Sequence, residues 1–266
     1  MKYIFSNKNR ALLAELVRTD FKLRYQGSVL GYAWSLLKPL LMFGILYIVF
    51  VRFLKVGGDI DNYPIYLLIG IVLWNFFIEM TSQSLGAIVA RGDLIRKIRI
   101  PRWIIIISAS VSALINLMLN LIVVAIFIMF SDVAIRPVIV WFPIVVFQIY
   151  LLALGISLFL SAAYVKYRDV SYIWEVVTQA GFYMTPVLYP LSVIPALIYQ
   201  KLLLLNPLAQ AIQDARYALV TPETLTMGGV YKASWPHLIP LGITAFILLI
   251  GTLYFKKESK YFAENL

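Results

Sequence analysis

The chain has 266 residues, of which 62% are hydrophobic and 14% are charged. A soluble domain is nearer to half apolar and a quarter charged, so the composition excludes an ordinary soluble protein and indicates several membrane-spanning helices. The lack of cysteine excludes disulfides and thiolate chemistry, and the net charge of +10 is a topology signal and not a sign of nucleic-acid binding.

The first 31 residues are expected to form a cytoplasmic segment with an interfacial helix. Leu13, Val17 and Phe21 recur at i+4 within residues 11–25, and charged residues occupy a different face. This pattern predicts a basic amphipathic helix on the membrane surface, attracted to anionic lipid. A simple anchor is the alternative role.

Six apolar stretches of about 20 residues predict six membrane-spanning helices, at 32–51, 63–90, 103–130, 138–165, 172–191 and 238–255. Most of the 23 basic residues fall before the first stretch, after the second and fourth, and in the tail 256–266. The positive-inside rule therefore places both termini in the cytoplasm. The predicted fold class is an all-α polytopic membrane protein with one transmembrane domain, residues 32–255.

Several predicted spans carry polar residues on one helical face. Glu79 and Gln83 are four residues apart in the second span, as are Glu175 and Gln179 in the fifth. Polar groups in hydrocarbon are costly, so these faces should meet protein or water. Packing between helices is as good an explanation as a cavity or a subunit interface. The third span has a similar row, at Ser108, Ser112, Asn116 and Asn120.

The loop RGDLIRKIRIPR, residues 91–102, interrupts the apolar chain with a short basic segment. Asp93 can cap a helix there, and Pro101 ends it. The apolar residues Leu94, Ile95 and Ile98 alternate with Arg96, Lys97 and Arg99. An amphipathic helix of this length predicts a docking element for a cytoplasmic partner, or else a solvated basic face beside anionic lipid.

Four prolines, at 186, 190, 195 and 207, divide the apolar stretch 185–207. Proline removes a backbone donor and ends helices, so short helical pieces are expected. We expect a re-entrant hairpin on the outer side of the membrane, with an external loop and an interfacial helix as the alternative.

The chain lacks the sequence motifs of common enzymes. It has no phosphate-binding loop, no Gly-x-Ser-x-Gly and no His-Glu-x-x-His, and its single histidine cannot form a metal site. We therefore expect no catalytic residue and no metal site. The remaining classes are a permease driven by a separate ATPase, a stand-alone channel or ion-coupled carrier, and, more distantly, a membrane-embedded lipid or sugar transferase.

Six segments spread over nearly the whole chain carry a family resemblance. They are RYQGSVLGYAWSLLKPLL (24–41), YPIYLLIGIVLWNFF (63–77), LIRKIRIPR (94–102), YRDV (167–170), TPVLYP (185–190) and LNPL (205–208). In this order they resemble the membrane subunits of type-2 ABC exporters, in the branch that exports lipid-linked polysaccharides such as O antigen and teichoic acid. The family more often has Phe at the positions of Ile100 and Tyr167.

The resemblance implies a permease in a bacterial inner or plasma membrane that pairs with a second copy of itself and with two copies of an ABC ATPase. ATP and Mg²⁺ would bind to the ATPase, and this chain would need no cofactor. The cargo would be an undecaprenyl-linked polysaccharide, either O antigen or teichoic acid. Export of drugs or small lipids is the alternative within the same architecture.

The resemblance also assigns expected roles to residues. The coupling helix seated in the ATPase would be Gly92, Asp93, Leu94, Ile95, Arg96, Lys97, Ile98, Arg99 and Ile100. The lipid headgroup would be received by Arg24, Gln26, Gly27, Ser28, Leu30 and Gly31. The outer gate would comprise Pro186, Leu188, Tyr189, Pro190, Val193, Ile194 and Leu197. Polar and aromatic side chains are expected along the channel, at Tyr32, Tyr66, Trp74, Phe77, Glu79, Gln83, Glu175, Gln179 and Tyr183.

Overall fold

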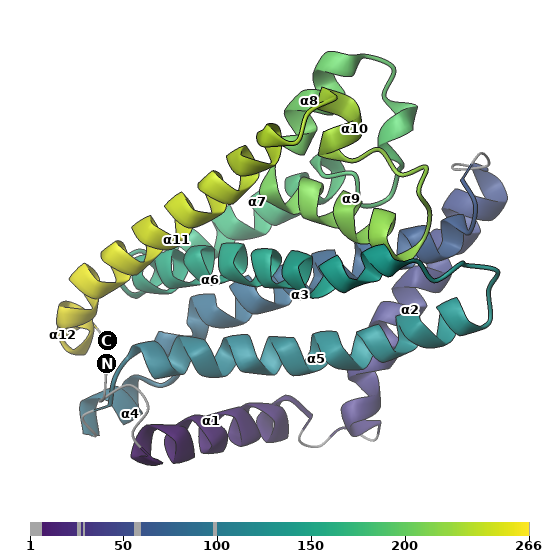
Figure 1. The fold of residues 1–266 in the computed structure, drawn as a ribbon. Helices are drawn as coiled ribbons and strands as arrows, with labels where there is room; N and C mark the ends of the chain where they lie inside the picture. Colours follow the sequence, from purple (N-terminus) through teal and green to yellow (C-terminus); the bar gives the residue numbers. More distant parts are fainter. Residues whose placement is uncertain (1–6, 26–27, 29, 56–59, 98–99, 266) are drawn as a thin grey trace.

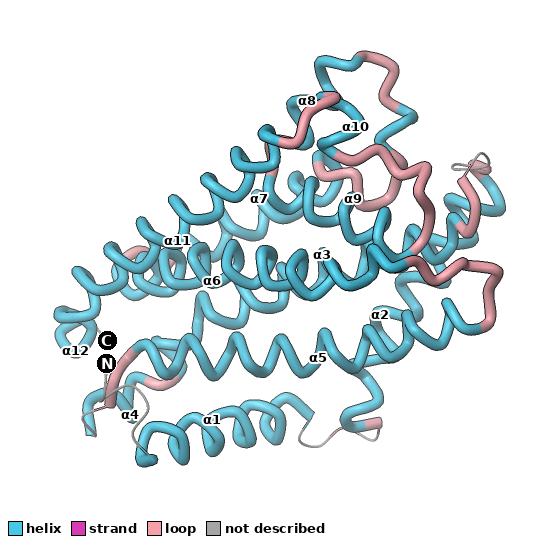
Figure 2. The backbone as a smooth tube through the Cα atoms, in the orientation of Figure 1, coloured by secondary structure: helices cyan, strands magenta, loops and turns pink. Residues whose placement is uncertain are grey.

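The computed structural model describes the chain except for residues 1–6, 26–27, 29, 56–59, 98–99 and 266. All regular structure in the described part is helical, as the composition predicts (Figures 1 and 2). The α-helices are α1 Asn7–Tyr25, α2 Trp34–Leu46, α3 Tyr63–Ala90, α4 Gly92–Lys97, α5 Trp103–Met129, α6 Phe142–Lys166, α7 Val170–Met184, α8 Leu197–Leu204, α9 Pro207–Leu219, α10 Met227–Tyr231, α11 Leu238–Glu258 and α12 Phe262–Asn265. Short 3₁₀ or π segments are η1 Gly31–Ala33, η2 Tyr47–Phe53, η3 Pro137–Trp141, η4 Leu191–Val193, η5 Trp235–His237 and η6 Ser259–Tyr261.

Five helical segments in the described part are long and apolar enough to cross a membrane. They match five of the six predicted spans, and they cover Trp34–Phe53, Tyr63–Ala90, Trp103–Met129, Pro137–Lys166 and Trp235–Tyr261. The protein is therefore an all-helical, multi-pass membrane protein.

The fifth predicted span, residues 172–191, is not one continuous helix. Helix α7 has 15 residues, about 22 Å at 1.5 Å per residue, whereas a bilayer core is about 30 Å thick. The helix ends because Pro186 disfavours helical backbone at the preceding residue, and Thr185 is indeed extended, with φ −91° and ψ 136°.

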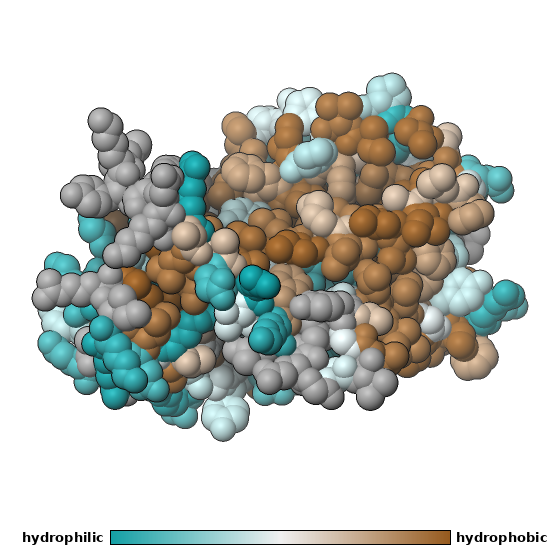
Figure 3. All heavy atoms as spheres, turned by 90° about the horizontal axis from the view of Figure 1, so that it is seen from below, coloured by the Kyte–Doolittle hydropathy of each residue, from teal (hydrophilic) through white to brown (hydrophobic). Residues whose placement is uncertain are grey.

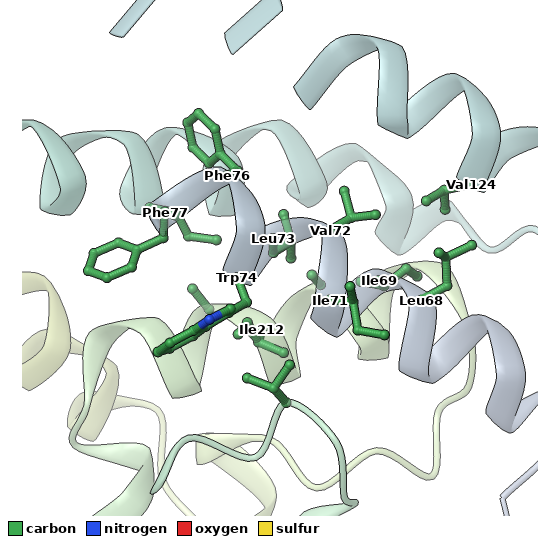
Figure 4. Packing of buried hydrophobic residues seen from close by; sticks show 14 of the residues in the cluster. Leu68, Ile69, Ile71, Val72, Leu73, Trp74, Phe76, Phe77, Val124 and Ile212 are labelled. Carbon is green, nitrogen blue, oxygen red and sulfur yellow. The ribbon is translucent and has the colours of Figure 1, made fainter. Parts of the chain in front are cut away.

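Helix α3 lies at the centre of the bundle. It packs against α5, α6 and α9. In its most apolar 18-residue stretch 78% of the residues are buried, compared with 11% in the corresponding stretch of the segment formed by α2 and η2. Figure 4 shows Leu68, Ile71 and Trp74 of α3 in one apolar cluster with Ile212 of α9. Apart from the polar face that carries Glu79 and Gln83, the helix is largely apolar, as is expected at such a central position.

Helices α6 and α11 approach each other closely where they cross. A Cβ atom added at Gly155 would lie 2.7 Å from the Cα of Leu248, and one added at Gly251 would lie 2.1 Å from the carbonyl oxygen of Gly155. Small residues at a crossing let two membrane helices bring their backbones into contact. These two glycines therefore set the spacing of α6 and α11.

Three segments converge at one end of the molecule, where α4, α12 and the start of α1 lie near one another (Figure 1). Asp20, in the last two turns of α1, forms an ion pair with Arg91, at the C-cap of α3, so the later part of α1 lies beside the end of α3. Ile95 of α4 packs in an apolar cluster with Phe255 and Phe262 near the C-terminus. On the face seen in Figure 3, hydrophilic side chains are densest toward this end and hydrophobic ones cover much of the rest.

The glycine crossing can be tested with one methyl group. In Gly251→Ala the new Cβ meets backbone that cannot move aside, so we expect a loss of about 1–3 kcal/mol in unfolding free energy. Gly242→Ala is the matched control, because a Cβ there meets nothing within 4 Å. Thermal unfolding of purified protein in detergent measures both, and equal midpoints for the two variants would contradict the close crossing.

Candidate functional site

The proline-rich stretch after α7 forms short pieces, as predicted, followed by a helix that was not predicted. Residues 185–190 turn without regular structure, then η4 and α8 follow. The amide nitrogen of Leu208 donates to the Oδ1 atom of Asn206, 3.0 Å away, which caps the first turn of α9. Helix α9 then runs back into the bundle and contacts α3, α6 and α11.

A buried arginine on α9 holds the start of this stretch. Arg216 is fully buried. Its Nε donates to the carbonyl oxygen of Tyr66, 2.9 Å away, and its Nη1 and Nη2 donate to the carbonyl oxygens of Pro186 and Val187, both 2.6 Å away. Nη1 also donates to the Oε1 atom of Gln213, and the guanidinium carbon lies 3.9 Å from the ring centroid of Tyr66.

The surroundings of Arg216 are shaped to receive it. A Cβ atom at Gly70 would lie 2.3 Å from Nη2, so a glycine is needed there. The hydroxyl of Tyr63 adds a second tie to the stretch, because it donates to the carbonyl oxygen of Leu188, 2.6 Å away. Burial lowers the pKa of Arg216, but an arginine side chain stays protonated in proteins, so its charge is compensated by these oxygens and the Tyr66 ring.

The residues expected to form the gate therefore divide into two groups. Pro186, Leu188 and Pro190 are buried in the anchored part, and the Tyr189 hydroxyl donates to the carbonyl oxygen of Tyr183, 3.1 Å away. The others lie in the outer part formed by η4 and α8, where Val193 and Leu197 are exposed and Ile194 is half-buried.

The segment expected to couple to an ATPase is partly the helix α4, residues 92–97, while Ile98 and Arg99 lie outside the described residues. Ile95 is buried against the chain's own C-terminal residues, Leu94 is half-buried, and Arg96 and Lys97 are exposed. Within the described part of α4, a partner would meet mainly charged side chains.

The segment expected to receive a lipid headgroup joins α1 to α2. Gln26 and Gly27 lie outside the described residues, and Arg24 is in the last turn of α1. The amide of Gly31 donates to the Oγ atom of Ser28, 3.2 Å away. Gly31 has φ +48°, a left-handed conformation that favours glycine, and the side chain of Leu30 is exposed.

Glu79 and Gln83 line a cavity of about 690 Å³ between α2, α3 and α5. The carboxylate of Glu79 accepts hydrogen bonds from Nδ2 of Asn116 and from Nε2 of Gln83. Further polar lining comes from Lys38, Ser35, Asn75 and Asn120. The row of asparagines on the third span thus faces the polar face of the second.

The remaining residues expected along a channel lie elsewhere. Tyr66, Trp74 and Phe77 are buried inside the protomer. Glu175, Gln179 and Tyr183 lie on the exposed face of α7, where Nε2 of Gln179 donates to Oε1 of Glu175. Tyr32 lies in η1. A single chain therefore does not bring the expected channel residues together.

Sequence reasoning missed α9 and its polar residues. Besides Arg216, this helix carries a second polar chain, in which Nε2 of Gln148 on α6 donates to Oε1 of Gln210, and Gln210 donates to Asp214. Burial raises the pKa of Asp214 to about 6, against the opposing effects of Gln210 and His237. An alternation of small apolar and amide residues in PLAQAIQDARYAL was the available signal.

The anchoring role of Arg216 can be tested by removing its donors. Arg216→Met keeps the unbranched apolar stem but leaves buried carbonyl groups unpaired, so we expect a loss of roughly 3 kcal/mol in unfolding free energy. Arg136→Met is the control, since Arg136 is half-buried and donates to one carbonyl, that of Tyr217. Gly70→Ala acts partly on the same contact, so its effect should be smaller when Arg216 is already Met, although the new Cβ would still lie 2.8 Å from the carbonyl oxygen of Val187. Additive losses in the double variant, measured by thermal unfolding, would contradict the anchor.

Comparison with known proteins places the chain in a family. The family model described as ABC-2 type transporter matches residues 11–220, from α1 to the end of α9. The chain is 30% identical to an O-antigen export system permease protein RfbA of Klebsiella pneumoniae, over 96% of this chain and 95% of that protein. It is 29% identical to a protein of the same description from Myxococcus xanthus, over 97% and 96%. It is 26% identical to the polysialic acid transport protein KpsM of Escherichia coli, over 79% and 80%. The chain therefore belongs to the ABC-2 type transporter family.

Proposed function

We propose that this chain is the membrane-spanning permease subunit of an ATP-driven polysaccharide exporter, and that its cargo is an O antigen. The proposal is carried by the similarity to O-antigen export permease proteins, which is continuous over nearly the full length of both chains. The chain has no phosphate-binding loop, so hydrolysis of ATP with Mg²⁺ takes place on a separate ABC ATPase subunit.

The exposed face of α7 supports pairing with a second copy. Tyr172, Ile173 and Val176 on this helix are 71%, 62% and 66% exposed, and Glu175 and Gln179 are exposed beside them. A carboxylate facing lipid is costly, whereas one facing a protein partner or a water-filled path is tolerated. A second copy placed here covers the apolar residues and turns the polar ones toward a shared path. The segment 185–205 then completes the fifth of the six crossings, which α7 begins.

The end that holds α4 is the cytoplasmic side in this proposal. The basic residues of the α4 loop and of the C-terminal tail gather there, as the positive-inside rule requires. The exposed Arg96 and Lys97 seat against acidic residues of the ATPase, and both termini lie in the cytoplasm of an inner or plasma membrane.

Transport follows from this arrangement. The lipid headgroup, an undecaprenyl pyrophosphate, is received by Arg24 and the segment up to Gly31, and the glycan passes along the path between two copies. Arg216 keeps the 185–190 stretch fixed, so opening of the outer end is a movement of η4 and α8. Their exposed apolar residues, such as Val193 and Leu197, form a dewetted seal when closed.

A capsular polysaccharide is the second candidate cargo, favoured by the similarity to a polysialic acid transport protein. Teichoic acid, drugs and small lipids are cargoes of other exporters that the sequence resemblance leaves open. These candidates can be separated by experiment, because each one predicts that a different molecule accumulates inside the cell when export fails.

Deleting the gene in its host should cause a lipid-linked glycan to accumulate and the same glycan to disappear from the cell surface. Mass spectrometry of extracted lipid-linked glycans identifies the cargo, and surface labelling measures export. A wild-type copy should restore both. An unchanged surface glycan, with no lipid-linked species accumulating, would rule out the proposed export role.

The docking role of α4 is tested by reversing its exposed charges. Arg96→Glu combined with Lys97→Glu should lower co-purification with the ATPase at least tenfold, because two attractive contacts become repulsive. Lys257→Glu combined with Lys260→Glu is the matched control, since both residues are exposed at the same end but lie outside α4. Normal co-purification of the α4 variant, or an equal loss in the control, would contradict the docking role.

A further inference from the structure

A second cavity lies between α5, α6 and α11, close to the end that holds α4. Its volume is about 470 Å³, and it is bounded by the residues that lead from α4 into α5, by α5 itself, by α6 and by α11. The lining residues are Ile100, Pro101, Arg102, Trp103, Ile107, Leu154, Leu158, Thr252, Phe255, Lys256 and Ser259. No residue in this set is acidic.

The cavity is a groove because of how its three helices pack. Helix α11 packs along α6, and α5 packs mainly along α3, so α5 and α11 flank α6 without closing over it. Leu154 and Leu158 of α6 form the floor, Ile107 forms one wall and Thr252 the other. Thr252 is exposed, so on a membrane protein the groove opens toward lipid.

The cytoplasmic mouth of the groove carries two cations. Arg102 donates to the carbonyl oxygen of Ser259, and its guanidinium lies 5.9 Å from the ring centroid of Phe262, which holds it at the rim. Lys256 is exposed on α11 and also lines the groove. The nearby acid Glu258 interacts electrostatically with Lys166 and Tyr254, which lie outside the groove lining.

We propose that this groove binds a resident anionic phospholipid of the inner leaflet. One acyl chain lies on the apolar floor, and the phosphate sits between the Arg102 guanidinium and the Lys256 ammonium. An apolar trough with cations at one mouth complements a lipid with a charged phosphate and a long chain. Trp103, at the same mouth, has the amphipathic ring that is enriched at the membrane interface. This inference concerns binding alone and does not depend on the proposed cargo.

The bound lipid has a structural consequence. Its phosphate bridges the residues just after α4 to the C-terminal part of α11, which otherwise meet through the Arg102–Ser259 hydrogen bond and the Arg102–Phe262 contact. The lipid thereby fastens the α4 end of the chain to the last membrane-spanning helix.

The charged contact is tested by native mass spectrometry of the full chain in detergent, titrated with phosphatidylglycerol or with phosphatidylcholine. The wild type should retain one phosphatidylglycerol in preference to phosphatidylcholine. Lys256→Gln should weaken that binding about fivefold, since one cation near a membrane surface contributes on the order of 1 kcal/mol. Lys257→Gln is the matched control, because Lys257 is the adjacent exposed lysine and does not line the groove. Equal effects of the two substitutions, or equal retention of both lipids, would overturn the proposal.

The apolar floor is tested by filling it. Ile107→Trp should place an indole in the groove and abolish the retained lipid, whereas Ile122→Trp, at a 57% exposed position on the same helix, should leave it. Thermal unfolding of both variants confirms that they are folded, and Lys256→Gln keeps the test decisive if Ile107→Trp unfolds the protein. Organic extraction of the purified protein identifies the natural occupant. A glycerophospholipid supports the proposal, and a polyprenyl phosphate in its place overturns it in favour of a cargo-lipid site.

Discussion

The buried guanidinium of Arg216 joins three parts of the chain that are far apart in sequence: the first turn of α3, the stretch after α7, and α9. All of its acceptors within the described residues are neutral oxygens, with the Tyr66 ring as a further contact. A buried charge is tolerated only when its donors are satisfied, so the three parts must keep this arrangement together. This arrangement fixes the start of the stretch after α7, whereas η4 and α8 pack separately, through Leu191 and Leu204, against Met227 of α10.

Hydropathy predicted the five long membrane-spanning helices, because length and apolar content are local properties that each segment carries by itself. A short helix at α4 was also predicted, because a capping acid begins that segment and a later proline ends it. The predicted extent of α7 was wrong, because the apolar sequence continues past Met184 while Thr185 and Pro186 end the helix. The position of Arg216 could not be predicted, since its acceptors are backbone carbonyls of distant segments and carry no side-chain signal.

The two acidic rows show why spacing alone does not assign a site. Glu79 and Glu175 have the same i+4 partner, a glutamine, and the same apolar surroundings in sequence. In the fold, Glu79 faces Asn116 and a cavity within the protomer, whereas Glu175 lies on the exposed face of α7. The difference comes from which helices pack together. The first carboxylate is enclosed within one chain, whereas the second meets only Gln179 of its own helix and lies exposed, and this difference is what motivates the proposal of a path between two copies.

The crossing of α6 and α11 at Gly155 and Gly251 has a mechanical consequence. Two helices whose backbones touch cannot slide or separate without losing that contact, so α6 and α11 are expected to move together as one rigid unit. At one end, this pair of helices contacts α4 through the cluster of Ile95, Phe255 and Phe262. At the other end it contacts α9, the helix that carries Arg216. Under the proposed coupling role of α4, a displacement of α4 reaches α9 through this pair, and it reaches the 185–190 stretch only through the contacts of Arg216.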